Sequence, residues 1–145
     1  MTRATISTVS PAHHAAVGRE IERRLLLSLA KLNAQSTNTT VVMTAESDDG
    51  QLIGGVLGST SYGWFLVKVL WVSEDHRNAG IGRNLMVSAE EQAREMGCHS
   101  AWLDTSNPHA RDFYLRLGYS DFGCLENGSN HEPVEHHRWF MQKKL

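Results

Sequence analysis

Hydrophobic positions recur at two different spacings along the chain, and these spacings predict helices and strands that follow one another. Between residues 15 and 32, apolar side chains return every three to four positions, which places them on one face of a helix. The same spacing predicts a helix over residues 81–96, ended by Gly97, and a shorter helix over residues 108–117.

Shorter runs rich in β-branched and other apolar residues predict strands. They cover residues 5–9, 39–45, 52–59, 64–72, 100–105, 119–125 and 137–141. The turn signal Asp48-Asp49-Gly50 joins the second and third strands as a hairpin, and the last strand is expected at an edge of the sheet. Strands that alternate with helices, with hairpins towards both ends, predict an α/β fold with a mixed sheet.

A glycine turn between the fourth expected strand and the helix after it carries the clearest chemical signal. Gly80 and Gly82 lack a Cβ, so a phosphate group can approach the main chain there. A helix that begins at this point offers unpaired N–H groups at the positive end of its dipole. The turn therefore predicts an anionic ligand.

The spacing of the glycines excludes two common phosphate sites. A dinucleotide-binding turn needs a third glycine three residues after the second, but position 85 is Leu. A Walker A loop needs a glycine, then four residues of any type, then Gly-Lys-Ser or Gly-Lys-Thr, and the sequence has no such run. Binding of NAD or FAD through a dinucleotide-binding turn, and of ATP through a Walker A loop, is thus disfavoured.

Two motifs resemble those of the GCN5-related N-acetyltransferase (GNAT) superfamily, whose members bind acetyl-CoA. Arg-x-x-Gly-x-Gly, which begins at Arg77 after a strand, resembles the family's pyrophosphate-binding motif. NPHARDFYLRLGY, which begins at Asn107, resembles its second signature, with an Asn, an Ala and the pair Phe113-Tyr114. The resemblance spans roughly residues 52–125.

The resemblance implies a GNAT (acyl-CoA N-acyltransferase) fold, with a mixed central sheet flanked by helices in a single domain over residues 1–145. In this family two neighbouring parallel strands splay apart, here the fourth and fifth expected strands, residues 64–72 and 100–105. The pantetheine arm of the cofactor lies in that gap, where unpaired strand groups bind its amides as they would bind an added strand.

Residue roles follow from the same resemblance. The main-chain N–H of Leu70 would donate to the thioester carbonyl as an oxyanion donor, and Val72 would pair with pantetheine. Tyr114 would protonate the departing thiolate or, alternatively, be a packed aromatic residue. Phe113 would be a core residue or a wall of the cofactor site, and Asn107 would contact pantetheine or cap the next helix. The pyrophosphate would be wrapped by Arg77, Asn78, Ala79, Gly80, Ile81, Gly82 and Arg83.

The general base is not evident, because the strand over residues 64–72 contains Lys68 and no carboxylate. An acceptor ammonium must lose a proton before it attacks the thioester. Glu46, Asp104 and His131 are candidates, each open to a surface or structural role instead.

Composition narrows the class of protein further. The chain has 145 residues, 41% of them hydrophobic, and a net charge of −2, so it lacks the basic excess of a nucleic-acid binder. It has no apolar run of the roughly 20 residues that a membrane span needs, and its N-terminus lacks an apolar export segment. Cys98 and Cys124 form no metal-type or redox pair, which favours free thiols at core or boundary positions and a cytoplasmic location. His131 and His136 are five residues apart with Pro133 between them, so no metal site is expected.

These observations favour an enzyme that transfers the acetyl group of acetyl-CoA to a primary amine by direct attack in a ternary complex. The acceptor would be a small-molecule or peptide amine, and the family's habit suggests a homodimer. Two alternatives stay open. One is a non-catalytic module that binds or senses acyl-CoA, and the other is a protein acetyltransferase acting on Lys or N-terminal amines.

Overall fold

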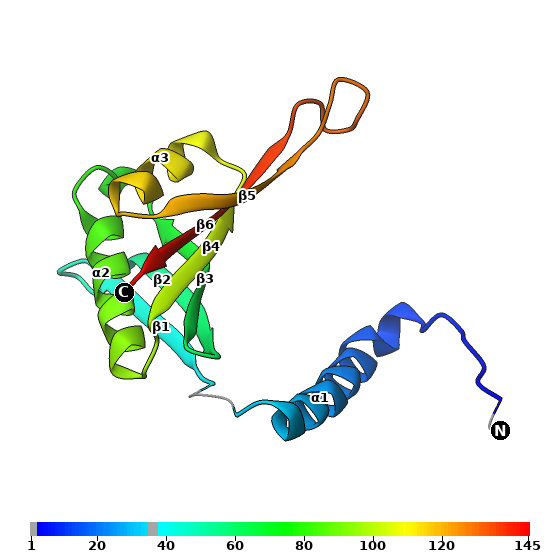
Figure 1. The fold of residues 1–145 in the computed structure, drawn as a ribbon. Helices are drawn as coiled ribbons and strands as arrows, with labels where there is room; N and C mark the ends of the chain where they lie inside the picture. Colours follow the sequence, from blue (N-terminus) through cyan, green and yellow to red (C-terminus); the bar gives the residue numbers. More distant parts are fainter. Residues whose placement is uncertain (1–2, 35–37) are drawn as a thin grey trace. The chain divides into compact units, whose positions relative to one another are not determined.

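The computed structural model describes residues 3–34 and 38–145. The chain divides into two compact units, Met1–Gln35 and Ser36–Leu145 (Figure 1). The second unit contains the glycine turn and the Phe-Tyr signature. A single domain over residues 1–145 stays a prediction.

The first unit contains one long helix, as its apolar spacing predicts. Helix α1 (His14–Leu32) follows the short 3-10 turn η1 (Pro11–His13), and neither element has a buried residue. Ile21 and Leu25 on the apolar face are 64% and 55% exposed. Within the described residues, no helix is long and apolar enough to cross a bilayer.

The prediction of a strand over residues 5–9 is wrong. These residues belong to no helix or strand, and Ile6 is 96% exposed. Their alternating sequence favours an extended backbone, but a strand also needs a neighbouring strand that pairs with its N–H and C=O groups. The described part of the first unit contains only helical elements, so it supplies no such neighbour.

The second unit is built on a six-stranded mixed sheet, which confirms the predicted fold class. Its strands are β1 (Thr40–Glu46), β2 (Leu52–Ser61), β3 (Trp64–Val72), β4 (Ser100–Thr105), β5 (Ser120–Glu126) and β6 (His137–Lys144). The order across the sheet is β1-β2-β3-β4-β6-β5. β3 and β4 run parallel, whereas the other neighbouring pairs are antiparallel.

The last strand does not lie at the edge of the sheet, contrary to prediction. β6 lies between β4 and β5, and β5 forms the edge. Met141 of β6 is fully buried opposite Leu103 of β4, while every residue of β5 is exposed. The strand with the buried apolar side chain therefore occupies the interior position, where strands on both sides shield it.

Two helices pack near the sheet. Helix α2 (Ile81–Glu95) contacts β1, β2 and β3, and α3 (Pro108–Arg116) contacts β4 (Figure 1). Leu85 and Ala89 are buried in the core, as their helical spacing predicts. Gly97 and Gly118 follow α2 and α3 with φ of +92° and +95°, left-handed values that end a helix without a Cβ clash.

The parallel pair at the centre of the sheet is joined over only part of its length. The ladder pairs Trp64–Leu66 of β3 with Ser100–Trp102 of β4. β3 then continues to Val72 and β4 to Thr105. Because α2 follows β3 and α3 follows β4, both helices begin at the same end of this parallel pair, beyond its ladder.

Candidate active site

A cavity of about 650 Å³ opens where β3 and β4 end and α2 and α3 begin. This size suits a small-molecule site. All the residues predicted to bind the cofactor or to act as the catalytic acid line it except Ala79, which is exposed and absent from the lining. The predicted residues that the structure brings together are Leu70, Val72, Arg77, Asn78, Gly80, Ile81, Gly82, Arg83, Asn107, Phe113 and Tyr114.

The glycine turn has the backbone of an anion-binding loop. Asn78 and Gly80 adopt left-handed φ values of +62° and +81°, which Asn and Gly tolerate better than other residues. Gly80 occupies the N-cap position of α2 but makes no side-chain hydrogen bond, so the helix start has no side-chain cap. The first N–H groups of α2, from Ile81 onward, therefore lack partners from within the helix and face the same end as the cavity.

Gly82 provides close packing between the turn and α3. A Cβ at this position would lie 3.4 Å from Phe113 Cζ and 3.7 Å from Val72 Cγ2. The hydrogen of Gly82 thus leaves the space between these two side chains open to the cavity. This geometry fits the close approach of a phosphate chain to the main chain.

Positive charge gathers around the cavity although the chain as a whole carries −2. Arg77, Arg83 and Arg116 line it, and no acidic side chain does. The Nε of Arg77 donates a 3.1 Å hydrogen bond to the carbonyl oxygen of Val72, so this guanidinium also holds the turn to the end of β3. The cavity is electrostatically suited to an anion.

Asn107 caps helix α3. Its side-chain oxygen accepts a 2.9 Å hydrogen bond from the main-chain N–H of His109, and Pro108 occupies the first helical position. Of the two roles expected for Asn107, the structure shows the one as N-cap of α3. A contact with pantetheine stays a prediction.

Tyr114 is the most buried polar group of the cavity. The residue is 8% exposed, and its ring packs edge-on between Phe113 and Tyr119, with ring centroids 5.2 and 5.8 Å away. Within the described residues its hydroxyl makes no hydrogen bond, so it can donate to a ligand. Burial raises the pKa of Tyr114 to about 12, which keeps the phenol protonated at physiological pH.

Several lining residues were missed by the sequence analysis. They are Trp71, His76, His109, Ala110, Arg116 and Leu117. The helical period from Phe113 would have found the apolar ones, Ala110 and Leu117, because positions three or four residues away share its face. His76 has a weaker signal: it follows β3 by a few residues, and its Nδ1 lies 2.7 Å from Ser73 Oγ.

The three candidate bases lie outside the lining of this cavity. Asp104 forms an ion pair with Arg138. The Nδ1 of His131 accepts a 2.9 Å hydrogen bond from the N–H of Gly128. Glu46 is exposed at the end of β1. Within the described residues, no group of three His, Cys, Asp or Glu side chains could hold a metal ion.

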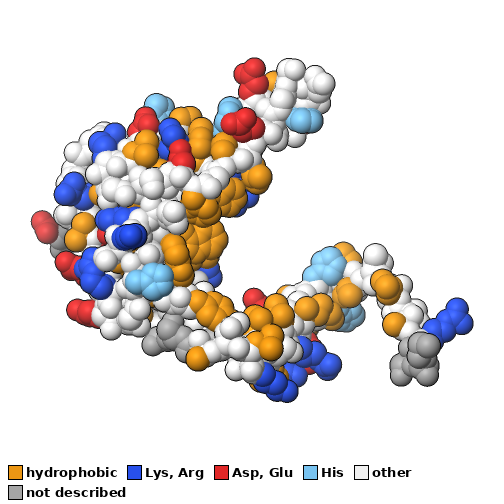
Figure 2. Space-filling view, viewed as in Figure 1, with side chains coloured by type: hydrophobic (Ala, Val, Ile, Leu, Met, Phe, Trp, Pro, Cys, Tyr) orange, Lys and Arg blue, Asp and Glu red, His pale blue; other side chains and the backbone are white. Residues whose placement is uncertain are grey.

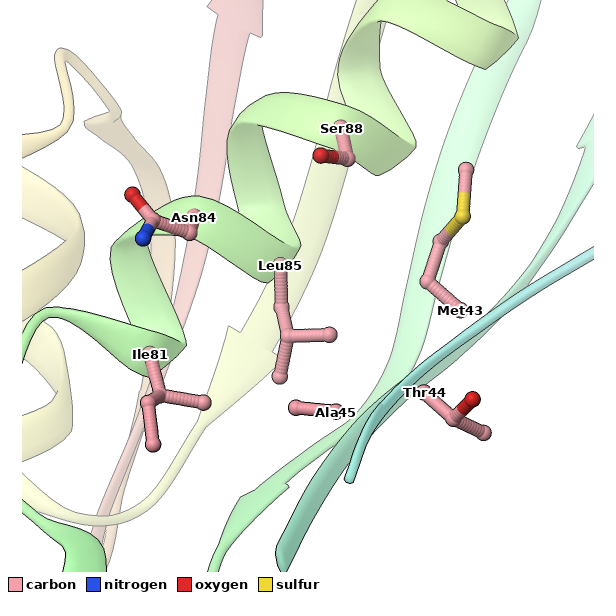
Figure 3. A pocket seen from close by; sticks show the side chains of 7 residues that line it. All are labelled: Met43, Thr44, Ala45, Ile81, Asn84, Leu85 and Ser88. Carbon is pink, nitrogen blue, oxygen red and sulfur yellow. The ribbon is translucent and has the colours of Figure 1, made fainter. Parts of the chain in front are cut away.

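A smaller groove of about 230 Å³ lies between α2 and β1 (Figure 3). It is lined by Met43, Thr44, Ala45, Ile81, Asn84, Leu85 and Ser88. Its polar groups are hydroxyls and an amide, with no titratable side chain. It offers no acid, base or charge for catalysis, so the larger cavity is the candidate active site.

The two cysteines are free, and only one is buried. Cys98 is 5% exposed, as expected of a core residue. Cys124 is exposed, which corrects the expectation of a core or boundary position for this residue. The reason is the edge position of β5, whose residues are all exposed.

Comparison with known proteins identifies the family. Residues 9–119 match the Acetyltransferase (GNAT) family, and the chain belongs to it. It is 40% identical over 91 residues to Acetyltransferase Atu2258 of Agrobacterium fabrum, covering 63% of this chain and 66% of that protein. It is 41% identical over 71 residues to the blasticidin-S acetyltransferase of Streptomyces morookaense, covering 48% and 52%. The chain thus spans about half to two thirds of the length of these relatives.

Solved structures confirm the fold. A crystal structure of a protein described as an acetyltransferase from Agrobacterium tumefaciens matches with a TM-score of 0.77 and 29% identity over 100% of both chains. A structure of a protein described as a streptothricin acetyltransferase from Bacillus anthracis, in complex with acetyl-CoA, matches with a TM-score of 0.66 and 18% identity. That match covers 76% of this chain and 64% of the other. The family and the fold support acetyl-CoA as cosubstrate, and the uncapped, cationic turn fits its pyrophosphate.

Proposed function

We propose that this protein transfers the acetyl group of acetyl-CoA to a primary amine by direct attack in a ternary complex. The observation that carries the proposal is one cavity with two features. An uncapped helix start with nearby arginines lines one part of it, and a buried, protonated Tyr114 lines another. The first suits a pyrophosphate, and the second suits a leaving thiolate.

Cofactor binding would use main-chain groups for the most part. The N–H groups of Ile81, Gly82 and Arg83 would bind the pyrophosphate at the positive end of the α2 dipole. Pantetheine would lie between β3 and β4 beyond Leu66, where the parallel ladder stops and both strands continue. Strand groups there would bind its amides, as in β-augmentation.

The reaction would form a nitrogen–carbon bond and break the carbon–sulfur bond of the thioester. As the amine attacks, negative charge develops on the carbonyl oxygen, and the N–H of Leu70 would stabilise it. A single donor of this kind can contribute on the order of 3 kcal/mol. The sulfur leaves with the bonding electrons and takes the Tyr114 proton, and the tyrosine regains a proton from solvent. The amine's proton would pass to water, since none of the three candidate bases lines the cavity.

Proton transfer from Tyr114 would be uphill in isolation. A thiol has a pKa near 8.5 in water, about three to four units below the value of about 12 for Tyr114. The same burial that raises the phenol pKa would also raise that of the thiol, which narrows the difference. A direct hydrogen bond between hydroxyl and sulfur would then matter more than the free pKa values.

Relatives suggest which acceptors deserve the first trial. Two relatives, at 41% and 36% identity over parts of the chain, are named for blasticidin S and streptothricin. A small-molecule amine is therefore our proposed acceptor class, ahead of a peptide amine. A homodimer and a cytoplasmic location stay predictions.

A non-catalytic acyl-CoA sensor remains the second candidate, favoured by the lack of a carboxylate in the cavity lining. Calorimetric titration with acetyl-CoA, with NADH and ATP as controls, separates binding from chemistry when paired with a thiol-release assay over a panel of amines. Binding with amine-dependent CoA release supports the enzyme. Binding without release for small-molecule, peptide and protein amines would favour the sensor, and no binding would refute the cofactor site.

A further inference from the structure

A buried polar cluster lies directly behind Tyr114. The Tyr119 hydroxyl donates a 2.8 Å hydrogen bond to Glu90 Oε1, and Lys143 Nζ donates a 2.7 Å hydrogen bond to Glu90 Oε2. Tyr119 and Glu90 are 2% and 4% exposed. Neither residue lines the cavity, so neither is placed to contact the substrate.

The cluster joins α2, β6 and the connection that follows α3. Glu90 is on α2, the helix that begins at the glycine turn, and Lys143 is on β6. Tyr119 follows α3, and its main-chain N–H donates a 3.0 Å hydrogen bond to the carbonyl oxygen of Tyr114. A carboxylate in the core of the unit is thus satisfied by two donors from outside its own helix.

The side chain of Tyr119 also sets one wall of the space that holds the Tyr114 ring. The two rings meet edge-on, with centroids 5.8 Å apart and planes inclined by 65°. Lys143 Nζ lies 5.6 Å from the centroid of the Tyr119 ring. With its hydroxyl bound to Glu90 and a cation beside its ring, Tyr119 is fixed at both its tip and its side.

We propose that Glu90, acting through the Tyr119 hydroxyl, positions the Tyr114 ring so that its hydroxyl points to the leaving sulfur. Tyr119 and Glu90 are positioning residues in this account, and they act on turnover rather than on cofactor affinity. The proposal rests on the acid role of Tyr114. It adds that the orientation of this acid depends on α2, the helix that would bind the pyrophosphate.

The alternative is that the cluster stabilises the fold and nothing more. A buried carboxylate that loses one donor is costly whatever its role, so a fall in stability alone decides nothing. The two accounts differ in how substitutions combine. A residue that acts only by orienting the Tyr114 hydroxyl has nothing left to orient once that hydroxyl is removed.

The test is a double-mutant cycle on kcat with Tyr114→Phe and Tyr119→Phe. Tyr119→Phe retains the ring and loses only the hydrogen bond to Glu90. We expect it to lower kcat about tenfold, with the acetyl-CoA dissociation constant within about twofold of wild type. Tyr114→Phe should lower kcat about a hundredfold. The double variant should equal Tyr114→Phe alone. Tyr62→Phe, the same change outside the cavity lining, is the matched control and should leave kcat unchanged.

A second pair of variants keeps the test informative if Tyr119→Phe folds poorly, as judged by circular dichroism. Glu90→Gln retains an oxygen that accepts from Tyr119, whereas Glu90→Leu retains none. We expect kcat of Glu90→Gln to stay within about threefold of wild type and Glu90→Leu to resemble Tyr119→Phe. Equal losses in these two variants would overturn the positioning role.

The outcomes separate this proposal from the proposed function. If Tyr114→Phe turns over as wild type does, the acid role fails, and the positioning role fails with it. If Tyr114→Phe has a lower kcat than wild type, and the double variant has a kcat that is lower still by the factor seen in Tyr119→Phe alone, only the positioning role fails. An unaltered kcat in Tyr119→Phe would also refute the positioning role and leave the acid role of Tyr114 standing.

Discussion

Arg77 is bound through its Nε to the carbonyl oxygen of Val72, 3.1 Å away, so the glycine turn is fixed to the end of β3 by its own arginine. The hydrogen bond leaves the terminal nitrogens of the guanidinium available to an anion. Arg77 would therefore serve the cofactor site twice, by shaping the turn and by adding positive charge beside the first N–H groups of α2.

Replacing Arg77 with Ala should weaken acetyl-CoA binding about tenfold, or about 1.4 kcal/mol, because a charge-assisted contact to the pyrophosphate is lost. Calorimetry measures the effect. Acetyl-pantetheine, which lacks the pyrophosphate, provides the comparison. If it binds wild type and Arg77→Ala equally well, the loss of acetyl-CoA affinity comes from a phosphate contact. Arg94→Ala, on α2 but outside the cavity lining, is the control. Equal weakening of both ligands would assign Arg77 to the shape of the turn alone.

Replacing Gly82 with Ala should raise thermal stability and lower affinity for acetyl-CoA. Ala is favoured over Gly within a helix by about 1 kcal/mol, and the added methyl would meet Phe113 at 3.4 Å, without a severe clash. That methyl would occupy the space left for the phosphate. The melting temperature and the dissociation constant are measured together.

Gly18→Ala in α1 is the matched control for this substitution, since a Cβ at Gly18 would meet nothing within 4 Å. It should raise helix stability by a similar amount and leave acetyl-CoA binding unchanged. A Gly82→Ala protein that binds acetyl-CoA as tightly as wild type would contradict the role of this glycine in the cofactor site.

The parts of the site that depend on local backbone requirements were predictable from sequence. Gly80 and Asn78 occupy left-handed conformations, and Asn107 caps a helix that Pro108 begins, so each residue type reflects its own geometry. The lining residue Arg116 was not predictable in the same way. An arginine near a helix end is equally suited to solvent, and only the tertiary packing turns it towards a cavity.

Strand order was the part of the fold that sequence could not supply. The alternation of β6 indicates a strand with one buried face, but it does not say whether one or two neighbours pair with it. β6 pairs with β4 and β5, and Met141 is buried in a core whose residues are far apart in sequence. Residues 5–9 illustrate the opposite error, since their extended pattern has no strand partner within their own unit.

Replacing Cys124 with Ser should leave turnover unchanged. Partial desolvation and the neighbouring Glu126 raise the pKa of the Cys124 thiol, so it is a poor source of thiolate. Cys124 is also absent from the lining of the cavity. Steady-state kinetics with both substrates varied should then give intersecting double-reciprocal lines, as a ternary complex requires. Loss of activity in Cys124→Ser, or parallel lines, would favour transfer through an acetyl-cysteine.

The buried phenol of Tyr114 should make the protein lose stability in alkali. Burial raises its pKa to about 12 in the folded state, whereas a tyrosine in an unfolded chain has a pKa near 10. The folded state therefore binds more protons between these values, and stability falls as pH rises through this window. At pH 11 the loss due to Tyr114 should be about 1.4 kcal/mol, the free energy of one pKa unit. Urea unfolding of wild type and Tyr114→Phe at pH 8 and pH 11 measures it: the variant should show the smaller decline. Equal declines in both proteins would mean that Tyr114 titrates as it does in water, and the argument for a desolvated acid in the cavity would fail.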